Sequence, residues 1–132
     1  MAVFTGGRKN TTAVRAGLKI NWATKNIVQP SMKRVYITDF VVKHVVGIDT
    51  CKLFVAKTGI RGANDLVWVG RAANWAAKLC TLGEAPTWIT KDVYDNIHNE
   101  AKFSNGKDMW EARSWTEMNN ASIYRSTYSW SL

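Results

Sequence analysis

Three polar side chains stand three and four residues apart in the segment RAANWAAKLCTL, residues 71–82. They are Arg71, Asn74 and Lys78. Residues at these spacings share one face of an α-helix, so a helical segment would carry two cations and an amide on a single stripe. Such groups bind phosphate and sugar oxygens. The stripe predicts a phosphate-binding face, and the alternative is an ordinary solvent-exposed charged face.

The residues before this stripe favour the same ligand. LVWVG, residues 66–70, predicts a strand that ends at a glycine, and the predicted helix follows at once. A helix that begins there presents unpaired backbone N–H groups and the positive end of its dipole at one place. Ala72, Ala73, Ala76, Ala77 and Leu79 lie on the opposite side, where they allow the helix to approach a sheet closely.

The rest of the chain predicts an α+β fold, an antiparallel sheet with helices packed on it, in one domain over residues 1–132. A long helix is expected from Thr11 to Val28, capped by Thr11 or Thr12 and ended before Pro30. Strands are expected at 1–4, at 35–49, at 52–59 and at 87–90, and a tight connection joins the second to the third. A loop is expected at 60–65, a helix at 91–101, and a hairpin in the tail around Asn105–Gly106.

Charge and apolar content limit the partners. The chain has 18 Lys and Arg against 10 Asp and Glu, a formal charge of +8, which suits an anionic ligand. No stretch approaches the ~20 apolar residues of a membrane span, so we expect a cytoplasmic protein without a membrane partner. Cys51 and Cys80 lack the spacing of a zinc site and are expected to be reduced, buried thiols.

Other reactive residues indicate no separate centre. His44 and His98 each stand alone and are interpreted as structural or surface histidines. The aspartates are scattered, without two on adjacent strand tips, and predict no metal site within this chain. The seven tryptophans suit packing better than a base-stacking platform, although a basic, Trp-rich binder of nucleic acid remains an alternative.

The run VVKHVVGIDTCKLFVAKTGIRGANDLVWVGRAANWAAKL, residues 41–79, resembles the second half of a class III nucleotidyl cyclase catalytic domain. A GI hairpin, a strand ending in Trp and Gly, and an Asn-bearing helix follow one another in the same order. Two parts of the chain are similar to the bacterial pyrimidine cyclases of antiphage (Pycsar) systems. One is the stretch RGANDLVWVGRAANWAAKL, and the other is the C-terminal tail with WEARSW, IYRS and a final Trp. The resemblance implies part of a ferredoxin-like cyclase domain.

The family's catalytic asparagine and the arginine four residues later match Asn74 and Lys78. The resemblance thus implies that these two contact ribose and triphosphate as the 3′-oxygen attacks the α-phosphate. Lysine keeps the charge but loses the bidentate donor geometry of arginine, and Arg71 is a candidate to supply part of it. Adenylyl cyclases read adenine with an aspartate where this chain has Val67, which favours a pyrimidine substrate, UTP or CTP.

The family's two metal-binding aspartates would precede Met1. The resemblance therefore implies a truncated pyrimidine cyclase, inactive alone, that needs Mn²⁺ or Mg²⁺ held by residues outside this chain. The expected activity is that of a pyrophosphate-releasing lyase in antiphage signalling, with cUMP preferred over cCMP as product. The expected partner is a second copy in a homodimer or a metal-bearing cyclase protomer. A non-catalytic regulatory half, a nucleic-acid-binding domain and an inactive remnant are the alternative interpretations.

Overall fold

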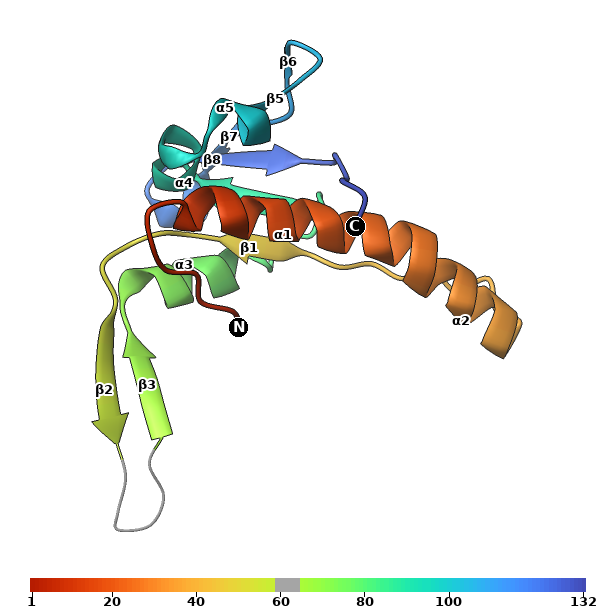
Figure 1. Ribbon diagram of the computed structural model, residues 1–132, viewed down its shortest axis with the longest axis horizontal. Helices are drawn as coiled ribbons and strands as arrows, with labels where there is room; N and C mark the ends of the chain where they lie inside the picture. Colours follow the sequence, from red (N-terminus) through yellow and green to blue (C-terminus); the bar gives the residue numbers. More distant parts are fainter. Residues whose placement is uncertain (59–64) are drawn as a thin grey trace.

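The computed structural model describes residues 1–58 and 65–132, and the side chains outside 56–69. Its α+β architecture is a mixed sheet with helices on both faces (Figure 1). The helical elements are α1 (Lys9–Ala23), a π-helical turn (Thr24–Val28), α2 (Gln29–Tyr36), α3 (Arg71–Leu79), α4 (Lys91–Asn96), α5 (Asn99–Lys102) and a 3₁₀ turn (Thr116–Met118). The strands are β1 (Val46–Ile48), β2 (Phe54–Thr58), β3 (Asp65–Val69), β4 (Thr87–Thr90), β5 (Phe103–Ser104), β6 (Lys107–Asp108), β7 (Glu111–Trp115) and β8 (Ala121–Ser126).

The main sheet has the strand order β1-β4-β8-β7. β8 runs antiparallel to both of its neighbours, but β1 and β4 are parallel, with Val46 opposite Thr87 and Ile48 opposite Ile89. The expectation of an antiparallel sheet is therefore wrong at this pair. The chain returns from β1 to β4 through the β2–β3 hairpin and α3, and parallel neighbours require such a long crossover.

Apolar residues on the two faces of the sheet form two clusters. The cluster on the α1 side includes Val14, Leu18, Ile48, Ile89, Val93, Ile97, Ala101, Met109 and Trp110. The cluster on the α3 side consists of Leu79, Ala85, Trp88, Trp115 and Ile123. Neighbouring strand residues such as Trp88 and Ile89 enter opposite clusters, as the two-residue period of a strand requires.

The long N-terminal helix differs from its prediction at both ends. It begins at Lys9, and Thr11 is buried within it, where its Oγ1 accepts a hydrogen bond from the His98 N–H at 3.0 Å. Helical backbone also continues through Pro30 to Tyr36. The wide turn Thr24–Val28 ends two residues before the proline, whose missing N–H and ring disturb an ordinary α-helical turn.

Several predicted strands are absent or shorter. Residues 1–4 form no strand, and within 35–49 only Val46–Ile48 does. β2 pairs with β3 in a separate hairpin and not with β1, so the predicted tight pair is wrong. The β2–β3 hairpin instead projects from the body (Figure 1). Residues 60–64 of the predicted loop and residue 59 of the predicted strand lie outside the described part of the chain, and Asp65 of the predicted loop begins β3.

Other predicted elements are confirmed with small changes of boundary. The strand before Gly70 is β3, the helix after it is α3, and the short strand after the GEAP break is β4. The predicted helix at 91–101 is two short helices, α4 and α5. Asn105–Gly106 forms the turn between β5 and β6, and β7 and β8 form a second hairpin in the tail.

Candidate functional site

Two glycines allow α3 to lie closely against the segment that runs from β1 to β2. A Cβ on Gly47 would stand 2.2 Å from the Ala76 carbonyl oxygen, so α3 rests directly on the backbone of β1. A Cβ on Gly70 would stand 2.6 Å from Leu53 Cδ2 and 3.3 Å from the Lys52 carbonyl oxygen. These contacts fix where α3 begins and which way its polar stripe faces.

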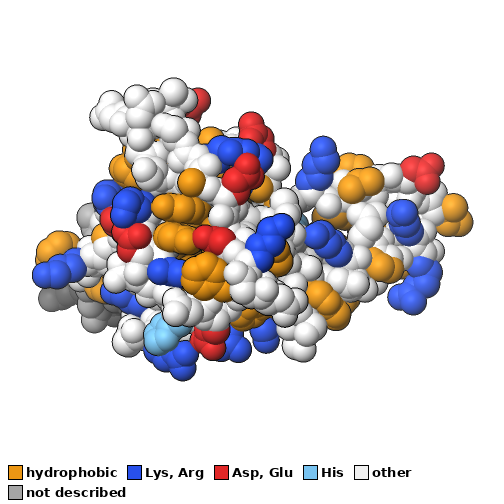
Figure 2. Space-filling view, turned by 90° about the horizontal axis from the view of Figure 1, so that it is seen from above, with side chains coloured by type: hydrophobic (Ala, Val, Ile, Leu, Met, Phe, Trp, Pro, Cys, Tyr) orange, Lys and Arg blue, Asp and Glu red, His pale blue; other side chains and the backbone are white. Residues whose placement is uncertain are grey.

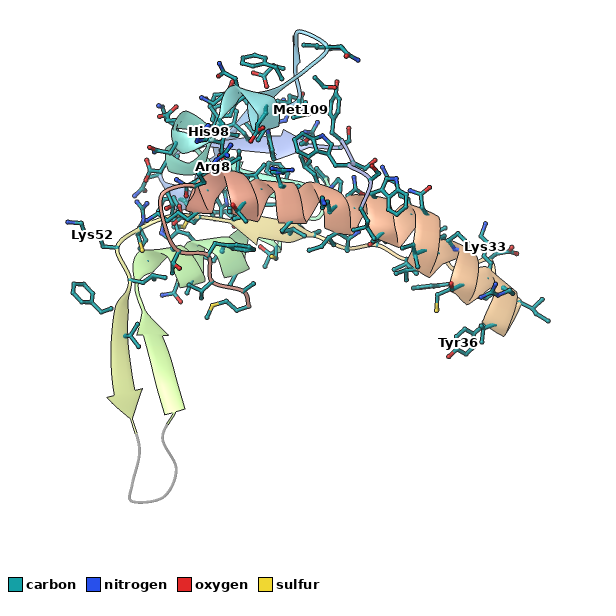
Figure 3. All side chains as sticks on the ribbon, viewed as in Figure 1. Arg8, Lys33, Tyr36, Lys52, His98 and Met109 are labelled. Atoms are coloured by element: carbon teal, nitrogen blue, oxygen red, sulfur yellow. The ribbon has the colours of Figure 1, made fainter. Side chains whose placement is uncertain are left out.

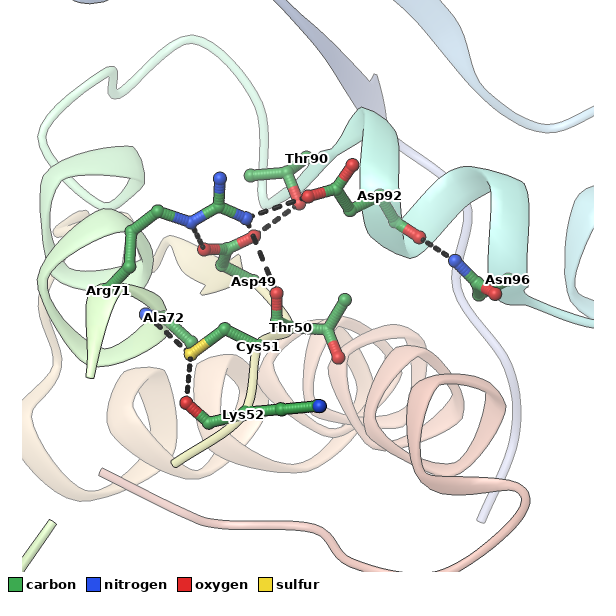
Figure 4. Close-up of polar contacts among 9 residues, drawn as sticks. All are labelled: Asp49, Thr50, Cys51, Lys52, Arg71, Ala72, Thr90, Asp92 and Asn96. Atoms are coloured by element: carbon green, nitrogen blue, oxygen red, sulfur yellow. Dashed lines mark hydrogen bonds and ion pairs between the residues drawn. The ribbon is translucent and has the colours of Figure 1, made fainter. Parts of the chain in front are cut away.

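The guanidinium of Arg71 lies among oxygens of three other residues, two that follow β1 and one in α4 (Figure 4). One Nη donates to Asp92 Oδ2 at 2.7 Å and to the Thr50 carbonyl at 3.4 Å, and Nε lies 3.6 Å from Asp49 Oδ2. The group also lies over the Trp75 ring, 4.8 Å from its centroid. The hydrogen bond to Asp92 raises the pKa of Arg71, and the charge of Asp49 acts in the same direction. Arg71 is thus a permanent cation held by two carboxylates.

The carboxylate of Asp49 is fully buried beneath this arginine. Its Oδ1 accepts a 2.6 Å hydrogen bond from Thr90 Oγ1, whereas its Oδ2 has no hydrogen-bond partner and faces only the ion pair with Arg71. Asp49 follows β1 and Thr90 ends β4, which are parallel neighbours, so the two meet at one end of the sheet. This carboxylate–hydroxyl pair was not among the predictions from the sequence.

The backbone at the first turn of α3 is hydrogen-bonded to a residue that follows β1. The Ala72 N–H donates to Cys51 Sγ at 3.3 Å, and this thiol lies close to the Lys52 carbonyl at 3.2 Å. Cys51 is half-buried and Cys80 is exposed, and both are free, so the expectation of two buried thiols is wrong for Cys80. One of the backbone N–H groups predicted to face a phosphate is therefore already hydrogen-bonded.

Asn74 and Lys78 are exposed on the same side of α3 as Arg71. Lys78 Nζ approaches Met118 Sδ at 3.8 Å, which places the ammonium beside the turn between β7 and β8. Next to them, Trp75 packs edge-on against Trp115 with ring centroids 5.6 Å apart. This aromatic pair anchors α3 on the sheet, and the amide of Asn74 and the ammonium of Lys78 beside it are exposed.

Val67 lies in β3, with its backbone opposite Ala56 of β2. Asp65 is two residues earlier in the same strand, opposite Thr58, which confirms that the two positions have strand spacing. The side chain of Val67 is outside the described set. Its proposed part in base selection therefore stays a prediction.

The described residues contain no group of three His, Cys, Asp or Glu side chains that could hold a metal ion. Asp49 and Asp92 both face the guanidinium of Arg71. A divalent cation would have to displace that arginine. The described residues thus do not fit the ion that the cyclase resemblance implies.

The surface offers little support for a base-stacking platform. Trp88, Trp110 and Trp115 are each no more than 5% exposed, which confirms packing roles for these three. On the face shown in Figure 2, Lys and Arg groups are interspersed with acidic and apolar ones. None of the described helices combines the length and apolarity that a membrane crossing requires.

Comparison with known proteins identifies relatives along almost the whole chain. It is 58% identical over 131 residues to a uridylate cyclase of Xanthomonas perforans and 53% identical over 132 residues to one of Burkholderia cepacia. A uridylate cyclase of Rhodovulum sp. (strain MB263) is 36% identical over 137 residues. These matches cover 97–100% of this chain. The chain is similar to uridylate cyclases throughout.

The same comparisons set a limit on that similarity. The chain spans only 57% of the length of each of these relatives. No family model matches it. The similarity is therefore to part of each uridylate cyclase.

Proposed function

We propose that this chain is the nucleotide-contacting portion of a pyrimidine nucleotide cyclase that makes cUMP from UTP. The observation that carries the proposal is its 58% and 53% identity to two uridylate cyclases. The exposed amide and ammonium on α3 supply the chemistry that such a substrate needs. CTP and cCMP are the second choice of substrate and product.

In the proposed reaction the ribose 3′-oxygen attacks the α-phosphorus of the triphosphate. A cyclic phosphodiester forms, the bond from the α-phosphorus to its bridging oxygen breaks, pyrophosphate leaves with the displaced electron pair, and the proton of the 3′-hydroxyl passes to solvent. Asn74 is proposed to orient the ribose by hydrogen bonds, and Lys78 to neutralise charge that develops on the phosphates. Groups that stabilise charge in the transition state in this way accelerate the reaction itself.

Arg71 and Val67 have proposed roles beside this pair. Arg71 is 45% exposed, so part of its guanidinium can contact a phosphate while Asp92 and Asp49 hold the rest. Val67 is proposed to lie where an adenine-reading carboxylate would otherwise stand. An apolar side chain there offers no acceptor for an adenine amino group, which favours a pyrimidine base.

Further parts of the proposal concern groups outside the chain. Mn²⁺ or Mg²⁺ is proposed to bind residues of the additional polypeptide that the relatives possess. The complete site is proposed to form in a homodimer or with a metal-bearing cyclase protomer. The cyclic nucleotide is proposed to act as a cytoplasmic signal in antiphage defence.

A chimaera tests the catalytic part of this proposal. The 131 matched residues of the Xanthomonas perforans relative are replaced by this chain, and cyclic nucleotide formation from UTP and CTP is measured with Mn²⁺. We expect cUMP from the chimaera and none from the 132-residue chain alone. Asn74→Ala and Lys78→Ala should each lower kcat by about 10²–10³-fold, the usual cost of losing one transition-state donor.

Lys33→Ala is the matched control. Lys33 is also an exposed lysine on a helix, but it lies on α2, far from α3 (Figure 3). Activity of this variant should equal that of the unmodified chimaera. If Asn74→Ala and Lys78→Ala behave like this control, the assignment of the α3 stripe is wrong.

A further inference from the structure

Two carboxylates share the guanidinium of Arg71, and they reach it at different depths. The side chain of Asp49 is 0% exposed, and its Oδ2 lies 3.6 Å from Nε. The side chain of Asp92 is 57% exposed, and its Oδ2 accepts a hydrogen bond from one Nη at 2.7 Å. One anion thus lies buried against the guanidinium, and the other lies at the surface, where a ligand would approach (Figure 4).

The buried carboxylate is held in place by the main sheet. Its Oδ1 accepts the hydrogen bond from Thr90 Oγ1 at the end of β4, which fixes the orientation of the carboxylate. Its Oδ2 has no hydrogen-bond partner among the described residues, and the ion pair with Arg71 compensates its charge. A buried charge that loses its partner is strongly unfavourable. Asp49 therefore holds the Nε end of the guanidinium in one position.

The exposed carboxylate uses the part of Arg71 that a phosphate needs. The Nη groups are donors that a guanidinium presents to phosphate oxygens, and Asp92 occupies one of them. A phosphate that contacts Arg71 therefore also lies near the negative charge of Asp92. Repulsion between two unit charges about 4–5 Å apart in water corresponds to about a fivefold loss of affinity. The guanidinium has other contacts that position it, namely Asp49, the Thr50 carbonyl and the Trp75 ring.

We propose that these two carboxylates have opposite effects on the affinity of Arg71 for phosphate. Asp49 is a positioning residue that fixes the guanidinium, and Asp92 is an internal competitor that weakens its hold on the ligand. The ligand is a polyphosphate, either the triphosphate of the substrate or the pyrophosphate that leaves. The inference rests on the proposed function, because it takes Arg71 as a contact of the triphosphate.

Pyrophosphate binding to the 132-residue chain, measured by titration calorimetry, tests the role of Asp92. Asp92→Asn keeps an oxygen that can accept from Nη and removes the charge. At low ionic strength its Kd should be about fivefold lower than that of the parent chain. The difference should disappear in about 1 M salt, where the screening length is only about 3 Å.

Asp95→Asn is the matched control for this variant. Asp95 is a carboxylate on the same helix, 48% exposed, but it pairs with Lys91 and not with Arg71. Its removal should leave the Kd for pyrophosphate equal to that of the parent. A parent chain that binds no pyrophosphate, an unchanged Kd in Asp92→Asn, or an equal gain in Asp95→Asn would each overturn the proposal.

The sign of a second change separates position from charge at Asp49. Asp49→Asn also removes a negative charge, which by itself would lower the Kd for pyrophosphate. Loss of the hold on Nε should instead raise the Kd at least about tenfold, because a displaced contact group loses most of its effect. Thr90→Val removes the hydroxyl that orients Asp49 and keeps its charge, so it should also raise the Kd, even where Asp49→Asn does not fold. A lower or unchanged Kd in Thr90→Val would refute the positioning role.

The chimaera with the Xanthomonas perforans relative separates this inference from the proposed function. There Asp92→Asn should lower the KM for UTP about fivefold, a gain that structural damage does not produce. Loss of activity in Asn74→Ala together with an unchanged KM in Asp92→Asn would overturn the inference alone. A chimaera that makes no cyclic nucleotide, although pyrophosphate binding responds as expected, would overturn the proposed function and leave a polyphosphate site at Arg71.

Discussion

Replacing Gly47 by alanine should lower the free energy of unfolding more than the same replacement at any other described glycine. The new Cβ would meet the Ala76 carbonyl oxygen at 2.2 Å and Leu79 Cβ at 2.8 Å. Neither atom can rotate away, so α3 must move off β1 or the strand must distort. Overpacking usually costs about 1–3 kcal/mol, and we expect about 3 kcal/mol here because the obstacle is helix backbone.

Urea unfolding measures this cost directly. With a slope of about 1–3 kcal/mol per molar urea, the unfolding midpoint of Gly47→Ala should fall by about 1–3 M. Gly7→Ala is the control, since a Cβ there has no neighbour within 4 Å, and its free energy of unfolding should stay within about 0.5 kcal/mol of the parent value. A Gly47→Ala midpoint equal to that of the control would refute the close packing of α3 on β1.

Two further predictions concern side-chain hydrogen bonds. The bond that Tyr94 donates to Asp108 at 2.6 Å raises the pKa of Tyr94 to about 12, so its stabilisation is complete below the ordinary value of about 10 and is lost as pH rises towards 12. In Asp108→Asn the phenolate absorbance of Tyr94 should appear nearer pH 10, and an unaltered titration would contradict this cause. Asn21 is 1% exposed and donates to the carbonyls of residues 127 and 128, so Asn21→Ala should cost about 1–3 kcal/mol in urea unfolding. Asn26→Ala, which removes an exposed bond within the same long helix, should cost less, and equal losses would show that Asn21 does not anchor the tail.

Local patterns predicted the elements that carry the candidate site. The glycine after an apolar strand located the start of α3 within a residue, and the spacing of Arg71, Asn74 and Lys78 placed them on one side of it. Turn residues predicted the β5–β6 hairpin at Asn105–Gly106. These features depend on neighbours within about four residues, so their physics is contained in short stretches of chain.

Predictions that depended on a distant partner failed. The β-branched run at 35–49 reads as a strand, but a strand also needs a ladder partner, and among the described residues only Val46–Ile48 has one. Pro30 reads as a helix end, yet it stands in the first turn of α2, directly after the wide turn, where the missing N–H of a proline is tolerated. Propensity is a weak preference that such tertiary contacts override.

The sequence by itself thus determined that one face of α3 carries an amide and two cations, because helical spacing is a local property. Only the tertiary structure decided what each group meets. The parallel pairing of β1 with β4 brings Asp49 and Thr90 together beneath Arg71, which becomes a held cation, while Asn74 and Lys78 stay exposed. Periodicity specifies which side of an element is buried, whereas strand pairing specifies which distant residues become neighbours.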